Sequence, residues 1–172
     1  MTDTKGNANY YAADEMMTVA ASRELKDETV CFVGIGLPSE AANLARATHA
    51  PSCVLIYESG TIGAKPDVLP LSIGDGVLAE HADSVVSVPE IFNYWLQAGR
   101  VDIGFLGAAQ LDRFGNINTT VVGDYHSPNV RLPGGGRSAR DRSFRQRGHH
   151  YAQAQAACPR QGAFLRYFRR VR

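Results

Sequence analysis

The 172-residue chain has a length typical of one domain, and its formal net charge of +1 conceals a strong asymmetry. Residues 1–136 hold 8 Lys and Arg against 16 Asp and Glu, a net charge of −8, whereas residues 137–172 hold 10 Arg and one acid, a net charge of +9. This asymmetry excludes a uniform globular domain. The 44% hydrophobic content excludes a chain that is disordered throughout.

The cysteines and the apolar runs indicate the cellular setting. Cys31, Cys53 and Cys158 form no CxxC pair, which argues against a disulfide framework and against a zinc site. No apolar run approaches the roughly 18 residues of a membrane-spanning helix. Residues 1–9 are polar and lack the hydrophobic stretch of a secretory signal. We therefore expect a cytoplasmic protein that does not associate with membranes.

Hydrophobic periodicity predicts alternating helices and strands, with a turn at 113–116 between two further apolar stretches, before the triple glycine at 134–136. Each predicted strand is almost entirely apolar, which is typical of a strand that is buried on both faces. This alternation predicts an α/β fold, with a mostly parallel sheet flanked by helices. The predicted elements, in chain order, are a helix at 10–26, a strand at 29–33, a helix at 38–47, a strand at 53–57, an apolar run at 84–88, a helix at 89–98, a strand at 101–106 and a turn at 113–116.

The character of the sequence changes after residue 136. Residues 137–172 show neither a strand pattern nor a sustained helical stripe. Three interpretations are open: a basic nucleic-acid arm, a solvated tail, or the product of a frameshift. We favour the frameshift, because codons permitted for the arginine-rich run at 137–143 encode an apolar sequence when they are read one base later. We therefore predict an aberrant, poorly ordered segment and no nucleic-acid partner.

The frameshift interpretation has a direct test in the coding DNA. We expect an inserted or deleted base near codon 136, because the pattern of the chain changes there. Sequencing the gene checks this expectation. Intact genes in related strains that encode this same tail would contradict it.

Two glycine-rich turns follow predicted strands. The first glycine turn comprises residues 34–36 and includes Gly34 and Gly36; the second comprises residues 58–63. In a parallel sheet the ligand site lies at the carboxyl ends of the strands. Glycines there let backbone N–H groups come close to a ligand. A lone GxG more often marks a tight turn, and the pattern is not GxGxxG, so a dinucleotide site is not supported.

Glu58 is the strongest candidate for chemistry, because it stands directly at the end of a predicted strand. Acids are disfavoured in buried strands, so this position needs a reason. The functional interpretation is a nucleophile or a general base. An exposed loop carboxylate, or one that caps neighbouring N–H groups, produces the same pattern. His49, His81 and His126 are scattered singly without the spacing of metal ligands, so we expect no metal site.

Several motifs occur in order between about residues 10 and 136. They are 32–38 (FVGIGLP), 41–45 (AANLA), 57–64 (YESGTIGA), 104–112 (GFLGAAQLD), 115–118 (GNIN) and 132–136 (LPGGG). Together they resemble the β subunit of family I CoA-transferases, with the glutaconate type most similar and the 3-oxoacid type next. The resemblance implies a CoA-transferase or NagB-like fold for residues 1–136.

The resemblance also implies a mechanism. In this family the glutamate that corresponds to Glu58 attacks an acyl-CoA, forms a mixed anhydride and then carries CoA as a glutamyl thioester. CoA is a substrate, no cofactor is needed, and the substrates are an acyl-CoA and a carboxylic acid. The family works with a separate α subunit, which would be the partner of this chain. The positions that the resemblance assigns to the substrate and CoA site are Gly34, Gly36, Ser59, Gly60, Gly135 and Gly136.

The chain departs from the family pattern at its end. Family β subunits continue beyond residue 136 with further strands, whereas this chain has the arginine-rich segment 137–172. We therefore expect that the C-terminal strands of the fold are missing and that the product is unstable or inactive. Two alternatives remain: an acyl-CoA hydrolase on the same scaffold, and a non-catalytic domain that binds a small molecule. For a phosphate sensor, Lys65 is the only basic residue close to the glycine turns in sequence.

Overall fold

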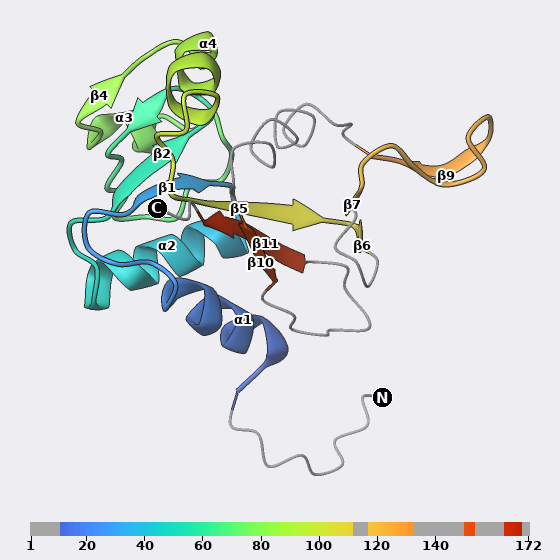
Figure 1. The fold of residues 1–172 in the computed structure, drawn as a ribbon, viewed down its shortest axis with the longest axis horizontal. Helices are drawn as coiled ribbons and strands as arrows, with labels where there is room; N and C mark the ends of the chain where they lie inside the picture. Colours follow the sequence, from blue (N-terminus) through green and yellow to red (C-terminus); the bar gives the residue numbers. More distant parts are fainter. Residues whose placement is uncertain (1–10, 112–116, 133–149, 154–163, 170–172) are drawn as a thin grey trace.

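A computed structural model describes residues 11–111, 117–132, 150–153 and 164–169, and its centre is a seven-stranded sheet (Figure 1). The strands lie in the order β10-β11-β5-β1-β2-β3-β4. Their bounds are β1 Val30–Val33, β2 Val54–Tyr57, β3 Thr61–Ile62, β4 Ser84–Val85, β5 Ile103–Ala108, β10 His150–Gln153 and β11 Phe164–Arg169.

The three central strands are parallel and the outer strands are antiparallel. β1 pairs in parallel with β2 on one side and with β5 on the other, and the register places Val33 opposite Tyr57. These strands are the apolar runs expected from the sequence, and their side chains are mostly buried. β3 and β4 continue the sheet antiparallel on the β2 side. The predicted α/β sheet flanked by helices is confirmed, with a parallel centre inside a mixed sheet.

Helices cover both faces of the sheet (Figure 1). On one face, α1 (Ala13–Ser22) and α2 (Leu37–Thr48) enclose a core that includes Leu25, Leu55, Tyr57 and Phe105. On the other face, a smaller core packs around Ile56. Among the described residues, no helix combines the length and the apolar character needed to cross a membrane.

The helix expected after Pro89 begins as an α-helix and continues as a wider π-helix. The short helix α4 (Val88–Glu90) leads into the π-helix η1 (Ile91–Leu96). The Gln97 N–H donates to the Phe92 carbonyl, which is the five-residue spacing of a π-helix. This spacing places Ile91 and Leu96 on the same side, and both are buried in the smaller core. The four-residue helix α3 (Val77–Glu80) precedes β4.

Two strands come from residues 137–172, where the sequence pattern predicted none. β11 pairs antiparallel with β5, and β10 pairs antiparallel with β11. The β11 sequence, FLRYFR, contains three aromatic residues, which have high β propensity. Arg166 and Arg169 in the same strand mask this signal when only charge and apolar runs are considered. That residues 137–172 arise from a frameshift stays a prediction.

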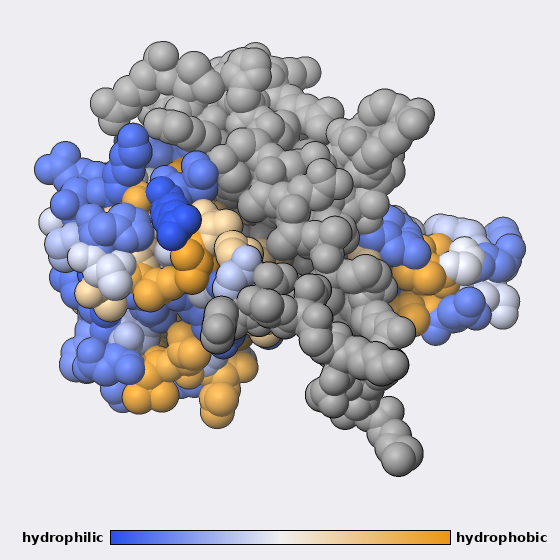
Figure 2. Space-filling view, turned by 90° about the horizontal axis from the view of Figure 1, so that it is seen from below, coloured by the Kyte–Doolittle hydropathy of each residue, from blue (hydrophilic) through white to orange (hydrophobic). Residues whose placement is uncertain are grey.

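Two short ribbons lie outside the main sheet. β6 (Gln110–Leu111) pairs with β7 (Ile117–Asn118), and β8 (Val121–Gly123) pairs with β9 (Pro128–Arg131). The β8–β9 hairpin projects to one side of the molecule in both views (Figures 1 and 2). Figure 2 shows apolar side chains along this hairpin among hydrophilic ones. The predicted turn at 113–116 lies outside the described residues.

The central strand β2 gives a direct test of the core. Leu55 is fully buried beneath α2, so Leu55→Ala should leave a cavity and lower the free energy of unfolding by about 2–5 kcal/mol. Val68 is 68% exposed, and Val68→Ala should change this free energy by less than about 0.5 kcal/mol. Urea denaturation of the full chain measures both values. Equal losses for the two variants would contradict the described core.

Candidate active site

The parallel pairing of β1 and β2 brings the two glycine turns side by side. Val33 and Tyr57 are register partners at the ends of these strands, so the next residues, Gly34 and Glu58, leave the sheet at the same edge. This is the carboxyl edge of the parallel strands, where α/β sheets bind ligands. The structure therefore brings together the start of the first glycine turn and the candidate nucleophile.

Glu58 stands at the boundary between the core and the surface. The preceding residue, Tyr57, is fully buried, while Glu58 itself is half-buried. The chain turns sharply after it, because the Gly60 N–H donates to the Tyr57 carbonyl at 3.1 Å. A carboxylate in this position is partly shielded from water and still reachable by a substrate, as a nucleophile must be.

Gly60 is required by the backbone of the second glycine turn. Its φ is +115°, a conformation that L side chains rarely adopt, and a Cβ there would overlap the Val86 carbonyl oxygen. The Val86 N–H donates to the Gly60 carbonyl at 2.9 Å, so the turn is held directly against the start of the β4–α4 connection. The turn that carries Glu58 is therefore fixed by backbone contacts.

Two hydroxyl groups of the second glycine turn are buried without a hydrogen-bond partner within the described part of the chain. They are the side-chain oxygens of Ser59 and Thr61. Buried polar groups are nearly always paired, so unpaired ones call for an explanation. A hydroxyl adjacent to the candidate nucleophile can donate to the oxygen of a bound carbonyl group.

The first glycine turn leads into the N-terminus of α2. Gly36 is the residue before the helix and has φ +83°, which favours glycine, although a Cβ there would have open space around it. A Cβ at Gly34 would lie 3.5 Å from the Phe105 carbonyl, an ordinary contact. Backbone N–H groups at a helix N-terminus attract negative charge. This turn can therefore supply N–H donors at the same edge of the sheet as Glu58.

A buried hydroxyl pair lies beneath the two turns, and the sequence reasoning missed it. The Ser39 hydroxyl donates to the Gly34 carbonyl at 3.1 Å, and the Ser39 and Tyr57 hydroxyl oxygens are also 3.1 Å apart. Burial raises the pKa of the Tyr57 phenol above its ordinary value, while the hydrogen bond to Ser39 opposes the rise. The only sequence signal was a serine at the second position of the helix predicted at 38–47, directly after Pro38.

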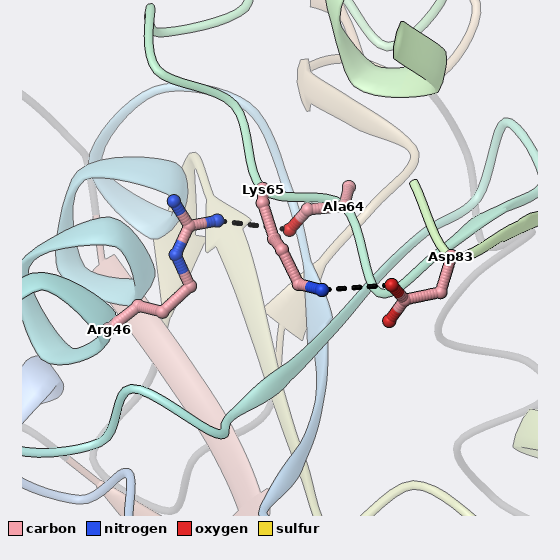
Figure 3. A network of polar contacts seen from close by, with 4 residues as sticks. All are labelled: Arg46, Ala64, Lys65 and Asp83. Carbon is pink, nitrogen blue, oxygen red and sulfur yellow. Dashed lines mark hydrogen bonds and ion pairs between the residues drawn. The ribbon is translucent and has the colours of Figure 1, made fainter. Parts of the chain in front are cut away.

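Lys65 is already paired with an acidic side chain. Its ammonium group forms an ion pair with Asp83 at 2.8 Å, and both side chains are more than half exposed (Figure 3). The preceding Ala64 N–H donates to the Leu55 carbonyl, so the chain has already run back along β2, away from Glu58. The Ala64 carbonyl accepts a hydrogen bond from Arg46 (Figure 3). These contacts remove the observation that favoured a phosphate sensor.

The thiols of Cys31 and Cys53 are poor nucleophiles. Both are buried, and burial is the main cause that raises the pKa of each; the pKa of Cys53 is about 11. A protonated thiol is unreactive, so neither competes with Glu58. The described residues contain no group of three or more His, Cys, Asp or Glu side chains that could hold a metal ion. The remaining sequence candidates, Gly135 and Gly136, lie outside the described residues.

Comparison with known proteins finds extensive similarity. Residues 14–151 match the family described as Coenzyme A transferase. Over 126 residues the chain is 75% identical to a subunit of 3-oxoadipate CoA-transferase from Pseudomonas knackmussii, covering 73% of this chain and 48% of that protein. Over 131 residues it is 37% identical to a subunit of glutaconate CoA-transferase from Acidaminococcus fermentans, covering 73% and 49%.

Solved structures show the same fold. The crystal structure of glutaconate coenzyme A-transferase from Acidaminococcus fermentans superposes with a TM-score of 0.67 at 33% identity, covering 76% of this chain and 52% of that one. The decarboxylase AibA/AibB superposes with a TM-score of 0.67 at 28% identity, covering 76% and 55%. The chain thus spans about half the length of the proteins that it matches.

The turn that carries Glu58 gives a testable requirement for glycine. Gly60→Ala should lower the free energy of unfolding by more than about 1 kcal/mol, because the added Cβ meets the Val86 carbonyl and the backbone φ is unsuitable. Gly74→Ala is the control, since its Cβ would have open space at an ordinary φ, and should change stability by less than about 1 kcal/mol. Thermal denaturation of both variants checks this. A Gly60→Ala chain as stable as wild type would contradict the described turn.

Proposed function

Because the chain belongs to the coenzyme A transferase family, we propose that it forms the β-type part of an enzyme that moves CoA from an acyl-CoA to a carboxylic acid. The observation that carries this proposal is the position of Glu58, half-buried at the carboxyl edge of the parallel strands and next to the first glycine turn. Glu58 is the proposed nucleophile.

The proposed reaction begins with attack by a Glu58 carboxylate oxygen on the thioester carbonyl of the donor. The carbon–sulfur bond breaks, CoA leaves as a thiolate, and Glu58 becomes a mixed anhydride with the acyl group. The thiolate then attacks the glutamyl carbonyl. The anhydride carbon–oxygen bond breaks, the donor acid leaves as a carboxylate, and CoA remains on Glu58 as a thioester. An acceptor carboxylate takes the CoA by the same steps in reverse.

The surroundings of Glu58 support this chemistry. A carboxylate is a weak nucleophile toward a thioester in water, so it needs partial desolvation and fixed placement. Half-burial and the tight turn closed at Gly60 supply both. The negative charge that develops on the attacked oxygen needs hydrogen-bond donors. The Ser59 hydroxyl and the N–H groups of the first glycine turn are the proposed donors, with Gly135 and Gly136 as further candidates from the family resemblance.

The relatives support a substrate and a partner. The protein that is 75% identical to this chain is named as a 3-oxoadipate CoA-transferase subunit, so we infer a 3-oxo dicarboxylic acid as the acceptor. Two relatives are each named as one subunit of a CoA-transferase, which supports an α-type subunit as the partner that completes the site. A cytoplasmic location and a mechanism without a cofactor accompany this proposal.

Dependence on the acceptor acid separates the proposal from the hydrolase alternative. A hydrolase would use water in place of the acceptor acid, and would consume acyl-CoA when no acceptor is present. The similarity to a decarboxylase shows that this fold does not by itself determine the reaction. CoA transfer therefore has to be tested by acceptor-dependent exchange.

The central residue is tested by Glu58→Gln in the full chain, produced together with an α-type subunit. We expect CoA exchange to fall by at least about 10³-fold, because the amide cannot form the anhydride. Glu80→Gln, which changes an exposed glutamate on α3, should leave exchange unchanged. Incubation with acyl-CoA should also make the wild type, and not Glu58→Gln, sensitive to hydroxylamine, which cleaves the glutamyl thioester.

A second version of the chain separates the chemistry from the effect of residues 137–172. In it, that segment is replaced by the sequence of the shifted reading frame. If only this second version exchanges CoA, the present segment 137–172 inactivates the protein. Full exchange by Glu58→Gln in either version, or no exchange by either wild type, would contradict the proposed function.

A further inference from the structure

Three oxygen atoms form a continuous chain beneath the two glycine turns. The phenol of Tyr57 lies 3.1 Å from the hydroxyl of Ser39, and that hydroxyl lies 3.1 Å from the carbonyl oxygen of Gly34. Tyr57 and Ser39 are both fully buried. The chain of oxygens therefore runs from strand β2, through helix α2, to the turn that follows β1.

The direction of these hydrogen bonds follows from counting protons. A serine hydroxyl has one hydrogen, and Ser39 donates it to the Gly34 carbonyl. Ser39 must then accept from Tyr57, so the phenol is the donor of the second bond. Burial favours the neutral phenol, which keeps this proton available. Bonds aligned in one direction polarise and strengthen one another.

The two ends of this chain of hydrogen bonds lie at the two turns. Tyr57 directly precedes Glu58, and Gly34 opens the first glycine turn. The bond from Ser39 holds the Gly34 carbonyl toward the core. All described peptide bonds are trans, so the following N–H, that of Ile35, points the opposite way, out of the core. The orientation of the Ile35 N–H in the first glycine turn is thus linked to Tyr57, the residue directly before Glu58.

Packing alone does not require these hydroxyl groups. Tyr57 belongs to a core of apolar side chains that a phenylalanine ring would also fill. Ser39 lies at the third position of α2, among the buried alanines of the same helix. A buried hydroxyl adds little net stability when it is paired and is costly when it is not. The Tyr57 and Ser39 hydroxyl groups are therefore better explained by a role in positioning the first glycine turn.

We propose that Tyr57 and Ser39 are positioning residues, whose hydroxyl chain fixes the first glycine turn relative to Glu58 during CoA transfer. This inference rests on the proposed role of Glu58. Small displacements of reacting groups slow such reactions by large factors. Loss of either hydroxyl therefore slows the chemical step more than it weakens substrate binding.

The test uses the version of the chain that exchanges CoA with its α-type partner, whether with the present or with the replaced C-terminal segment. Three variants are made in it: Tyr57→Phe, Ser39→Ala and the double variant. Each single variant should lower kcat by about 10–100-fold with KM changed less than about twofold. The double variant should be no worse than the less active single variant, because the two hydroxyls act as one unit. Ser22→Ala is the matched control, since the Ser22 hydroxyl is also buried in a helix and donates to the Val19 carbonyl. It should leave kcat unchanged.

Amide hydrogen exchange of this protein without its α-type partner supplies a measurement that does not depend on turnover. Tyr57→Phe should speed exchange of the amides at residues 35–36, although the substitution lies in a different strand. Ser39→Ala should do the same at residues 58–60. Ser22→Ala should speed neither region.

The outcomes separate this inference from the proposed function. Variants with unchanged kcat, in an enzyme that Glu58→Gln inactivates, would overturn the inference alone. Amide hydrogen exchange that speeds up equally across the whole protein would also overturn the inference, since it indicates a general loss of stability. A fully active Glu58→Gln enzyme would overturn the proposed function, and this inference with it.

Discussion

The site depends on one structural constraint, the parallel pairing of β1 with β2 in a register that places Val33 opposite Tyr57. A parallel pair sends both chains out of the sheet at the same edge. Gly34 and Glu58 therefore leave the sheet at the same edge. A shift of one residue would turn the side chains of β2 to the opposite face, and Tyr57 would leave the core beneath α2.

The two layers of helices protect this register. α1 and α2 enclose the core on one side of the strands, and η1 closes the smaller core on the other. Both faces of β1 and β2 are thus covered, so burial of apolar side chains holds the strands in place. The hydrogen bonds at Gly60 and Gly34 then add fixed turns at the edge. Rigid strands with short, fixed turns are a suitable support for a nucleophile that must meet its substrate at a defined distance.

The main features of this arrangement could be predicted from the sequence, because buried parallel strands consist of continuous apolar runs and the turns contain glycine. Glu58 stood out because a carboxylate at the end of such a run is unusual. The Tyr57–Ser39 contact could not be predicted, since it joins residues 18 positions apart and depends on how α2 packs. The two-residue strand β3 and the π-helical spacing from Ile91 to Leu96 are likewise set by tertiary packing.

The strands at the edge were missed for a different reason. The arginines of β11 hid an aromatic run that pairs with β5. Charge patterning describes how a segment interacts with water and says little about the backbone pairing available to it. The resemblance identified the family correctly because it rests on several motifs in a fixed order, and the family match over residues 14–151 covers that same region.

The central claim is that the Glu58 side chain itself becomes bonded to CoA. The most direct measurement is borohydride reduction of the protein after incubation with acyl-CoA, followed by mass spectrometry of the peptide that contains residue 58. The account predicts that the Glu58 carboxyl is converted to a hydroxymethyl group only when acyl-CoA is present. An unmodified Glu58 in a protein that exchanges CoA, or modification of a different residue, would contradict it.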